Sequence, residues 1–290
     1  MPHLIRLPLH HPEDFDPSQT LDCGQAFRFR PAADGRWEGV AGSRFARFRQ
    51  MGDALQIECW CPGGCENFWM DYFDLQRDYG ALKAEAAGDP VMQRAIAYCP
   101  GTRLLRQDPW EALCTFIISQ NNHIARIRRI VQALCLQAGP LIPAPALPKE
   151  DAAFTHAFPS PAAVAALNGE QLSLLRAGFR AKYIHDAAVR VTAGEISLSS
   201  LYSLPVEQAR KQLRSIYGVG PKVAECALLY GCGRSECFPR DVWINRALSQ
   251  LYPEGFPEAF SPIAGILQQY LFHYCRTCPG ALDQEKTGAR

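Results

Sequence analysis

The chain has 290 residues, of which 48% are hydrophobic and 20% are charged. That balance is typical of a folded globular protein and argues against disorder outside the chain ends. No apolar run approaches the roughly eighteen residues needed to cross a membrane, and the N-terminal stretch lacks the apolar core of a signal peptide. We therefore expect an intracellular protein that does not act in a membrane.

The formal net charge of +1 conceals an uneven distribution of charge along the chain. Residues 1–100 carry 10 basic and 14 acidic side chains, whereas residues 101–250 carry 17 basic and 11 acidic side chains. The middle of the chain therefore has an excess of positive charge. Such an excess is most often a solvated surface, but one basic face is also what binding to phosphate groups requires.

The first part of the chain has the pattern of an antiparallel sheet. Short segments that alternate apolar and polar residues are separated by turn-forming pairs such as Asp34-Gly35 and Gly52-Asp53. The predicted strands are LIRLPL, QAFRFR, RWEGVAG, SRFARFRQ and ALQIECW, all between residues 4 and 60. Helices that cover this sheet are expected over residues 66–75 and 90–98.

Helical periodicity dominates from residue 101 onward. Asp108-Pro109 has the form of an N-cap followed by proline at the first helical position. The proline-rich segment 139–148 is expected to run extended over the surface. The sequence predicts an α+β fold, with a sheet domain and flanking helices over residues 1–100 and a mainly helical domain over residues 101–290. The helices predicted in that second domain cover about residues 109–119, 123–137, 160–167, 169–177, 181–193, 205–216, 221–230, 241–251 and 262–275.

Two of these helices are joined by the short turn Gly218-Val219-Gly220-Pro221. The glycines can adopt backbone angles that residues with a Cβ reach only with strain, and Pro221 suits the first position of a helix. The segment is therefore predicted to be a helix-hairpin-helix, whose exposed N–H groups and positive helix end suit a phosphate. We expect Gly218, Val219 and Gly220 to contact a nucleic-acid backbone without reading its base sequence.

Lys222 and Asp241 are the candidate catalytic pair. Lys222 lies in the first turn of its helix, where the helix dipole disfavours a cation and so favours the neutral, nucleophilic amine. Asp241 precedes an apolar helical pattern and lies at the expected start of the next helix. Considered singly, a solvated lysine and an N-capping aspartate explain both residues. Together, after a phosphate-binding hairpin, they indicate a nucleophile and a carboxylate.

The segment 213–241 resembles the helix-hairpin-helix, Gly/Pro-rich loop and aspartate of the DNA glycosylase superfamily that includes endonuclease III. Two further segments, CGQAFRF at 23–29 and ISQNNHIARI at 118–127, resemble the corresponding segments of 8-oxoguanine DNA glycosylases. The resemblance implies a bifunctional DNA glycosylase and AP lyase that flips 8-oxoguanine opposite cytosine out of DNA. Lys222 would then form a Schiff base with the sugar, assisted by Asp241.

The resemblance also implies which residues recognise the bases. The base pocket would contain Gly24, whose carbonyl would accept the N7–H of the lesion, together with Cys226, Gln268 and Phe272. The residues expected to contact the orphaned cytosine, or to fill the gap left by the flipped base, are Asn121, Arg126, Phe179 and Arg180. Phe179 stands where the family often has tyrosine, and Trp243 stands where the animal enzymes have histidine.

The twelve cysteines do not form a complete metal-binding pattern. Cys59, Cys61 and Cys65 crowd one loop, and Cys275 and Cys278 form a lone CxxC pair. The four-cysteine cluster motif of many endonuclease III relatives is absent after Asp241. We expect no metal and no catalytic cofactor, with small buried thiols as the simplest interpretation. A zinc site that joins the two groups of cysteines remains an alternative, and the hairpin carbonyls could hold a structural monovalent cation, as in related proteins.

The expected partner is double-stranded DNA that contains oxidised guanine, bound by a monomer. Two alternatives stay open: a glycosylase for another base, such as an oxidised pyrimidine or adenine, and a DNA-binding module that has lost catalysis. A monofunctional glycosylase for alkylated bases is disfavoured, because those relatives usually lack the lysine at the position of Lys222.

Overall fold

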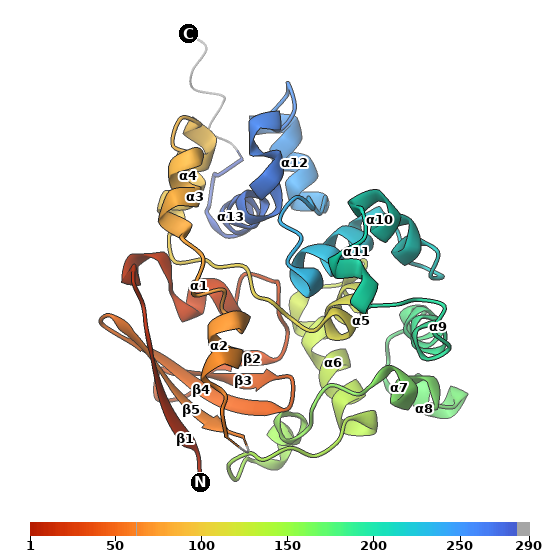
Figure 1. The fold of residues 1–290 in the computed structure, drawn as a ribbon. Coiled ribbons are helices and arrows are strands. Elements are labelled where there is room, and N and C mark those ends of the chain that lie inside the picture. Colours follow the sequence, from red (N-terminus) through yellow and green to blue (C-terminus); the bar gives the residue numbers. More distant parts are fainter. Residues whose placement is uncertain (62, 283–290) are drawn as a thin grey trace.

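The computed structural model describes residues 1–61 and 63–282. Its N-terminal part contains one antiparallel sheet with the strand order β1-β5-β4-β3-β2 (Figure 1). This arrangement confirms the predicted sheet and places the first strand of the chain at one edge. The strands are β1 (His3–Pro8), β2 (Phe29–Pro31), β3 (Trp37–Ala41), β4 (Arg44–Met51) and β5 (Ala54–Trp60).

One face of the sheet packs on helix α2 (Glu66–Tyr72). Alternate residues of β5 are buried on this face, as expected for a strand with one covered side. The ring of Phe48 in β4 meets the ring of Trp69 in α2 edge to face, with centroids 4.9 Å apart. Both side chains are fully buried, so this aromatic contact anchors the helix to the sheet.

The prediction of a strand at QAFRFR was wrong for its first four residues, because β2 begins at Phe29. The buried side-chain amide of Gln25 instead forms hydrogen bonds with the backbone of a distant segment. It donates to the carbonyl of Arg103 at 2.7 Å and accepts from the N–H of Leu105 at 2.8 Å. The preceding loop is thus tied to the start of the helical part of the chain.

Helices make up most of the remainder, which confirms the predicted α+β class (Figure 1). The sequence prediction missed α3, which Asp78 caps by accepting from the N–H of Ala81 at 2.9 Å. It also treated 221–230 as one helix, whereas a wider π-helical turn, Ala227–Gly231, follows α11. The helices beyond α2 are α3 (Tyr79–Glu85), α4 (Pro90–Tyr98), α5 (Pro109–Ser119), α6 (Ile124–Ala138), α7 (Pro161–Ala165), α8 (Gly169–Leu174), α9 (Arg180–Thr192), α10 (Val206–Arg214), α11 (Pro221–Cys226), α12 (Val242–Leu251) and α13 (Ala264–Thr277), and a short helix α1 (Pro17–Leu21) lies before the second strand.

The sheet and the helices have separate hydrophobic cores. Tyr79 and Met92, from α3 and α4, are buried with the helical core although they precede residue 100. The expectation that the helix at 90–98 covers the sheet is therefore wrong, because α4 packs on α13 instead. The division into domains 1–100 and 101–290 stays a prediction. The segment 139–148 contains no helix, as predicted, and its Ile142 and Leu147 pack beside Phe45 of the sheet. Within the described residues, no helix combines the length and the apolar character that a membrane crossing needs.

Candidate active site

The turn between α10 and α11 depends on Gly218. This glycine has a φ of +80°, and a Cβ at its position would lie 2.3 Å from the ring of Tyr183. Both the backbone angle and the close ring therefore exclude a side chain. The neighbouring Val219 is buried, and its N–H donates to the carbonyl of Ile216 at 3.1 Å. The hairpin is thus anchored to the core by a valine side chain and shaped by one glycine.

Gly220 serves a different purpose from Gly218. Its φ of −88° and ψ of 179° are extended angles that any residue adopts. The expectation that both glycines supply special backbone angles is therefore wrong for Gly220. A Cβ at this position would meet nothing within 4 Å, so the backbone here is open to an approaching group. At position 220, glycine therefore leaves room for a group that approaches the first turn of α11.

Lys222 is half-buried in that first turn. Its Nζ donates to the hydroxyl of Ser119 at 3.0 Å and lies 4.9 Å from the centroid of the Phe116 ring. Both contacts come from α5, against which α11 packs (Figure 1). The lysine is therefore not a freely solvated surface residue, because α5 fixes its amine at one place.

Asp241 caps helix α12. One carboxylate oxygen accepts from the N–H of Ile244 at 2.8 Å, which is the N-cap geometry expected from the sequence. This hydrogen bond fixes the carboxylate and leaves its second oxygen available. Lys222 and Asp241 are both within the described part of the chain, and no ion pair joins them.

One cavity of about 740 Å³ brings the predicted catalytic and base-pocket residues together. Its size falls within the range of about 300–1,000 Å³ that is usual for small-molecule sites. Phe116, Ser119, Tyr230 and Arg276 also line it, although the sequence did not point to them. The predicted residues in its wall are Gly24, Asn121, Lys222, Cys226, Asp241, Gln268 and Phe272. The predicted residues outside its wall are Arg126, Phe179, Arg180, Gly218, Val219 and Gly220.

The base-pocket residues form a largely apolar wall with a few polar groups. Gly24 has a φ of +84°, and a Cβ there would lie 3.2 Å from the ring of Phe272. Gln268 is 3% exposed, and its side-chain oxygen has no hydrogen-bond partner among the described residues. Burial raises the pKa of the Cys226 thiol to about 11, although the nearby Lys222 lowers it. Cys226 is therefore a neutral thiol near pH 7 and does not compete with the lysine as a nucleophile.

Side chains of α13 hold the loop that contains Gly24. Gln269 donates to the carbonyl of Cys23 at 3.1 Å and accepts from the hydroxyl of Tyr230 at 2.6 Å. Arg276 donates to the carbonyl of Asp22 at 2.9 Å. These contacts fix the backbone on one side of the cavity. Sequence reasoning missed these residues, because no local pattern links positions 246 residues apart.

Asn121 and Arg180 are in direct contact. Asn121 is exposed and has a φ of +46°, a left-handed conformation that asparagine tolerates. The guanidinium of Arg180 is buried beneath this turn, donates to the carbonyl of Asn121 at 2.8 Å and also donates to the carbonyl of Gln120. Arg180 therefore supports the conformation of the Asn121 turn. Its contact with an orphaned cytosine stays a prediction.

Phe179 and Arg126 lie beside this turn rather than in the cavity wall. Phe179 precedes α9 and is 50% exposed, which is unusual for a side chain of its size. Its ring meets the ring of Tyr183 edge to face at 5.5 Å. Arg126 donates to the carbonyl of Arg176 at 3.3 Å. An exposed aromatic ring and a cationic side chain are thus presented next to Asn121.

Among the described residues, no set of three converging metal-ligand side chains lies in the wall of the cavity. Three possible metal ligands do converge elsewhere among the described residues. They are Cys59, Cys61 and Cys65, which belong to the sheet part of the molecule. Cys275 is buried in the helical core, and Cys278 packs against that core. The structure does not support a zinc site that joins the two groups of cysteines, because the converging sulfurs do not include those of Cys275 and Cys278.

Two family models together match most of the chain. The N-terminal domain of 8-oxoguanine DNA glycosylase matches residues 7–113, and the HhH-GPD superfamily of base excision DNA repair proteins matches residues 114–255. The N-glycosylase/DNA lyase of Arabidopsis thaliana is 30% identical over 81% of this chain, which spans 66% of the length of that relative. A probable N-glycosylase/DNA lyase of Methanothermobacter thermautotrophicus is 31% identical over 74% of this chain and 75% of its own length.

Solved structures agree with these matches. The structure of MBOgg1 with a low-affinity DNA ligand is 39% identical, covers 94% of each chain and superposes with a TM-score of 0.86. The 8-oxoguanine glycosylase/lyase of Clostridium acetobutylicum, solved with double-stranded DNA that has cytosine opposite 8-oxoguanine, is 33% identical over 91% of this chain and 92% of its own, with a TM-score of 0.83. The chain therefore belongs to the 8-oxoguanine DNA glycosylase family, within the HhH-GPD superfamily of base excision DNA repair proteins.

Proposed function

We propose that this chain removes 8-oxoguanine from double-stranded DNA, preferentially where the lesion lies opposite cytosine, and then cleaves the DNA strand at the abasic sugar. The observation that carries this proposal is the single cavity that Lys222 and Asp241 share with Gly24, Gln268 and Phe272. A reactive amine, a carboxylate and a mostly apolar pocket suit a flipped nucleotide, because the sugar cannot be reached inside the duplex.

In the proposed reaction, the neutral amine of Lys222 attacks C1′ of the flipped nucleotide. The bond between Nζ and C1′ forms while the bond from C1′ to N9 breaks, and the base leaves with the bonding electrons and takes up a proton. Asp241 stabilises the positive charge that develops on the sugar and accepts a proton from the attacking amine. The bond from C1′ to O4′ then breaks as the nitrogen lone pair forms the C=N bond of the Schiff base, and O4′ takes up the proton held by Asp241. Loss of a proton from C2′ breaks the bond from C3′ to oxygen and releases the phosphate.

Recognition of the lesion rests on the other wall of the cavity. The carbonyl of Gly24 would accept the N7–H that distinguishes 8-oxoguanine from guanine, which has an acceptor at N7 instead. Gln268 would bond to the edge of the base, and Phe272 would stack on its ring. The unpartnered, buried side-chain oxygen of Gln268 supports this assignment, since buried polar groups ordinarily have a partner.

The surface beside the cavity would bind the rest of the duplex. We propose that the protein acts inside the cell and binds DNA as a monomer. We propose that Asn121 fills the gap left by the flipped nucleotide and that the exposed ring of Phe179 acts as an aromatic wedge in the duplex. Arg126 and Arg180 would contact the orphaned cytosine, for which a guanidinium provides suitable donors. The hairpin would hold one phosphate through the backbone N–H groups of Gly218 and Gly220, since that of Val219 donates to Ile216, and its carbonyls could hold a monovalent cation. Light scattering of the free protein and of its DNA complex tests the monomer.

Borohydride trapping tests the nucleophile. Reduction during turnover should attach an 8-oxoguanine duplex covalently to the wild-type protein and not to Lys222→Gln. Lys149→Gln is the matched control, because Lys149 is exposed in a different part of the molecule and does not line the cavity. The control should trap as the wild type does. Trapping by Lys222→Gln at the wild-type level would assign the chemistry to another amine.

A panel of duplexes separates the proposed function from its alternatives. Excision should be fastest for 8-oxoguanine opposite cytosine, and slower when the opposite base is changed. Preference for an oxidised pyrimidine or for adenine would mean that the pocket is assigned to the wrong base. Tight binding to lesion DNA without release of any base would identify a DNA-binding module instead.

A further inference from the structure

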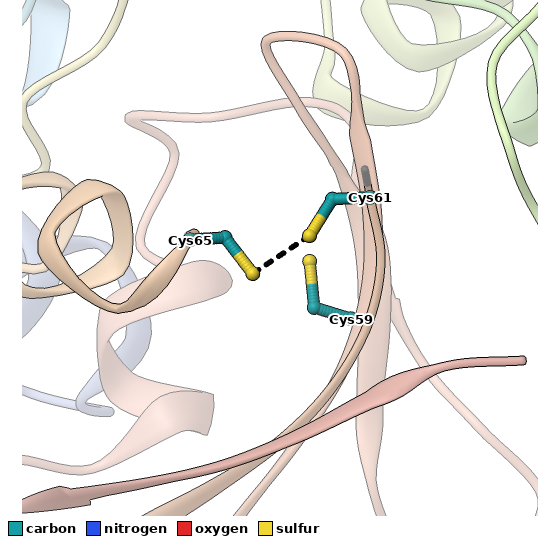
Figure 2. Close-up of side chains that lie close together, drawn as sticks. All are labelled: Cys59, Cys61 and Cys65. Carbon is teal, nitrogen blue, oxygen red and sulfur yellow. Dashed lines mark hydrogen bonds between the residues drawn. The ribbon is translucent and has the colours of Figure 1, made fainter. Parts of the chain in front are cut away.

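Three cysteine sulfurs converge where the sheet meets its covering helix. Cys59 lies in β5, Cys61 follows the end of that strand, and Cys65 is the residue before α2. Figure 2 shows the three side chains pointing toward one another. Their sulfur atoms all lie within 4.8 Å of one another, and the sulfurs of Cys61 and Cys65 are 2.8 Å apart. All three residues are buried.

The local backbone is built to make this convergence. Cys59 and Cys61 are two residues apart at the end of a strand, and side chains with that spacing point to the same face. The chain then returns through Gly63 and Gly64, which have φ values of +130° and +60°. A Cβ at either glycine would meet nothing within 4 Å, so the backbone angles rather than close neighbours favour glycine here. The two glycines turn Cys65 back toward the strand.

We propose that Cys59, Cys61 and Cys65 bind one thiophilic metal cation, Zn²⁺ or Cu⁺, through three thiolates. Two sulfurs that bind one zinc ion at about 2.3 Å in tetrahedral geometry lie about 3.8 Å apart, and the three sulfurs here all lie within 4.8 Å of one another. The contact between Cys61 and Cys65 would open by about 1 Å to reach the tetrahedral spacing. Thiolate ligands select such soft or borderline cations over magnesium and calcium.

A hydrogen bond from α2 reaches one sulfur of the cluster. The indole N–H of Trp69 points at the sulfur of Cys59, with the nitrogen at 3.4 Å. Such a hydrogen bond from the surroundings stabilises a metal-bound ligand and fixes its orientation.

This site would be structural. None of its cysteines lines the cavity that holds Lys222 and Asp241, and all three belong to the hydrophobic core of the sheet. A bound cation would join the end of β5 to the start of α2. The cluster offers three ligands among the described residues. Cu⁺ would be satisfied by these three, whereas Zn²⁺ would take a water molecule or a small thiol as its fourth ligand.

Metal analysis of the full-length protein is the first test. Elemental analysis after purification without chelators, followed by titration with Zn²⁺ and with Cu⁺, should show one tightly bound ion per chain. Cobalt, as a stand-in for zinc, should give the absorption bands of thiolate coordination. Cys61→Ser/Cys65→Ser should lose this binding, whereas the matched variant Cys275→Ser/Cys278→Ser should keep it. Equal metal binding by the wild type and the first variant would overturn the proposal.

Two measurements on the wild-type protein keep the test decisive if the first variant fails to fold. Because the three cysteines are buried, alkylation is followed in urea near the unfolding midpoint, where the preferred cation should protect Cys59, Cys61 and Cys65 but not Cys278. It should also raise the unfolding temperature, and a chelator should reverse this rise. Binding should weaken by up to about a thousandfold for each unit by which pH falls, because three protons compete with the cation. Unchanged alkylation, or a Cys61–Cys65 disulfide in place of metal, would overturn the proposal.

Discussion

Alanine at Gly218 and alanine at Gly220 should change stability in opposite directions. Gly218→Ala places a Cβ 2.3 Å from the ring of Tyr183 at a φ of +80°. The left-handed backbone costs about 1–2 kcal/mol, and overpacking of a filled site costs about 1–3 kcal/mol. We therefore expect Gly218→Ala to lower the free energy of unfolding by about 2–5 kcal/mol.

Gly220→Ala meets neither obstacle, because its φ is −88° and the space around it is open. Replacing glycine where the backbone angles are compatible stabilises a protein by about 0.4–1 kcal/mol, through the lower entropy of the unfolded chain. The methyl group would nevertheless obstruct a phosphate that approaches the hairpin. We expect Gly220→Ala to be as stable as the wild type or slightly more stable, and to bind duplex DNA more weakly.

Urea unfolding followed by tryptophan fluorescence measures the first effect, and fluorescence anisotropy with a duplex that carries an abasic-site analogue measures the second. The background Tyr183→Ala separates the two costs at Gly218, since it removes the ring but leaves the backbone strain. Gly218→Ala should then cost only about 1–2 kcal/mol. A loss of less than about 0.5 kcal/mol in the wild-type background, or equal losses for the two glycine variants, would refute this account of the hairpin.

Burial raises the pKa of Glu111 from 4.5 to about 7, although Arg28 lies 3.9 Å from its carboxylate and lowers it. Between these two pKa values the native protein therefore binds more protons than the unfolded chain. The free energy of unfolding should fall by up to about 3 kcal/mol as pH rises through this window. Urea unfolding at several pH values should show that Glu111→Gln flattens this dependence on pH. Tyr230→Phe leaves the oxygen of Gln269 without its donor and should cost about 1–3 kcal/mol. Because the hydrogen bond from Tyr230 to Gln269 supports the loop of the base pocket, the ratio of kcat/KM for 8-oxoguanine to that for guanine should fall. An unchanged ratio would show that this hydrogen bond does not contribute to recognition of the lesion. Phe179→Ala should leave stability within about 0.5 kcal/mol, since half of the ring is exposed, but should weaken DNA binding by about 1–3 kcal/mol, whereas Phe179→Tyr should bind normally.

Local signals predicted the starts of three helices and the hairpin correctly. Asp108 and Asp241 were predicted as N-caps, and both accept hydrogen bonds from the first turns of their helices. The hairpin at Gly218 and the start of α11 at Pro221 were also expected. Caps and tight turns depend on residues a few positions apart, so the sequence contains the information directly. The prediction of a strand at QAFRFR was wrong at its start, because the side chain of Gln25 is hydrogen-bonded to a segment about eighty residues away.

The sequence by itself determined the α+β class and the hairpin, and it offered Lys222 and Asp241 as the candidate nucleophile and carboxylate. The tertiary structure decided that Lys222 is held by Ser119 and that Gln269 supports the loop beside Gly24. It also decided that three cysteines converge and that Cys275 does not join them. These relations join segments up to 246 residues apart. They arise only when whole helices and strands pack, because packing selects the neighbours of a side chain and local propensity does not.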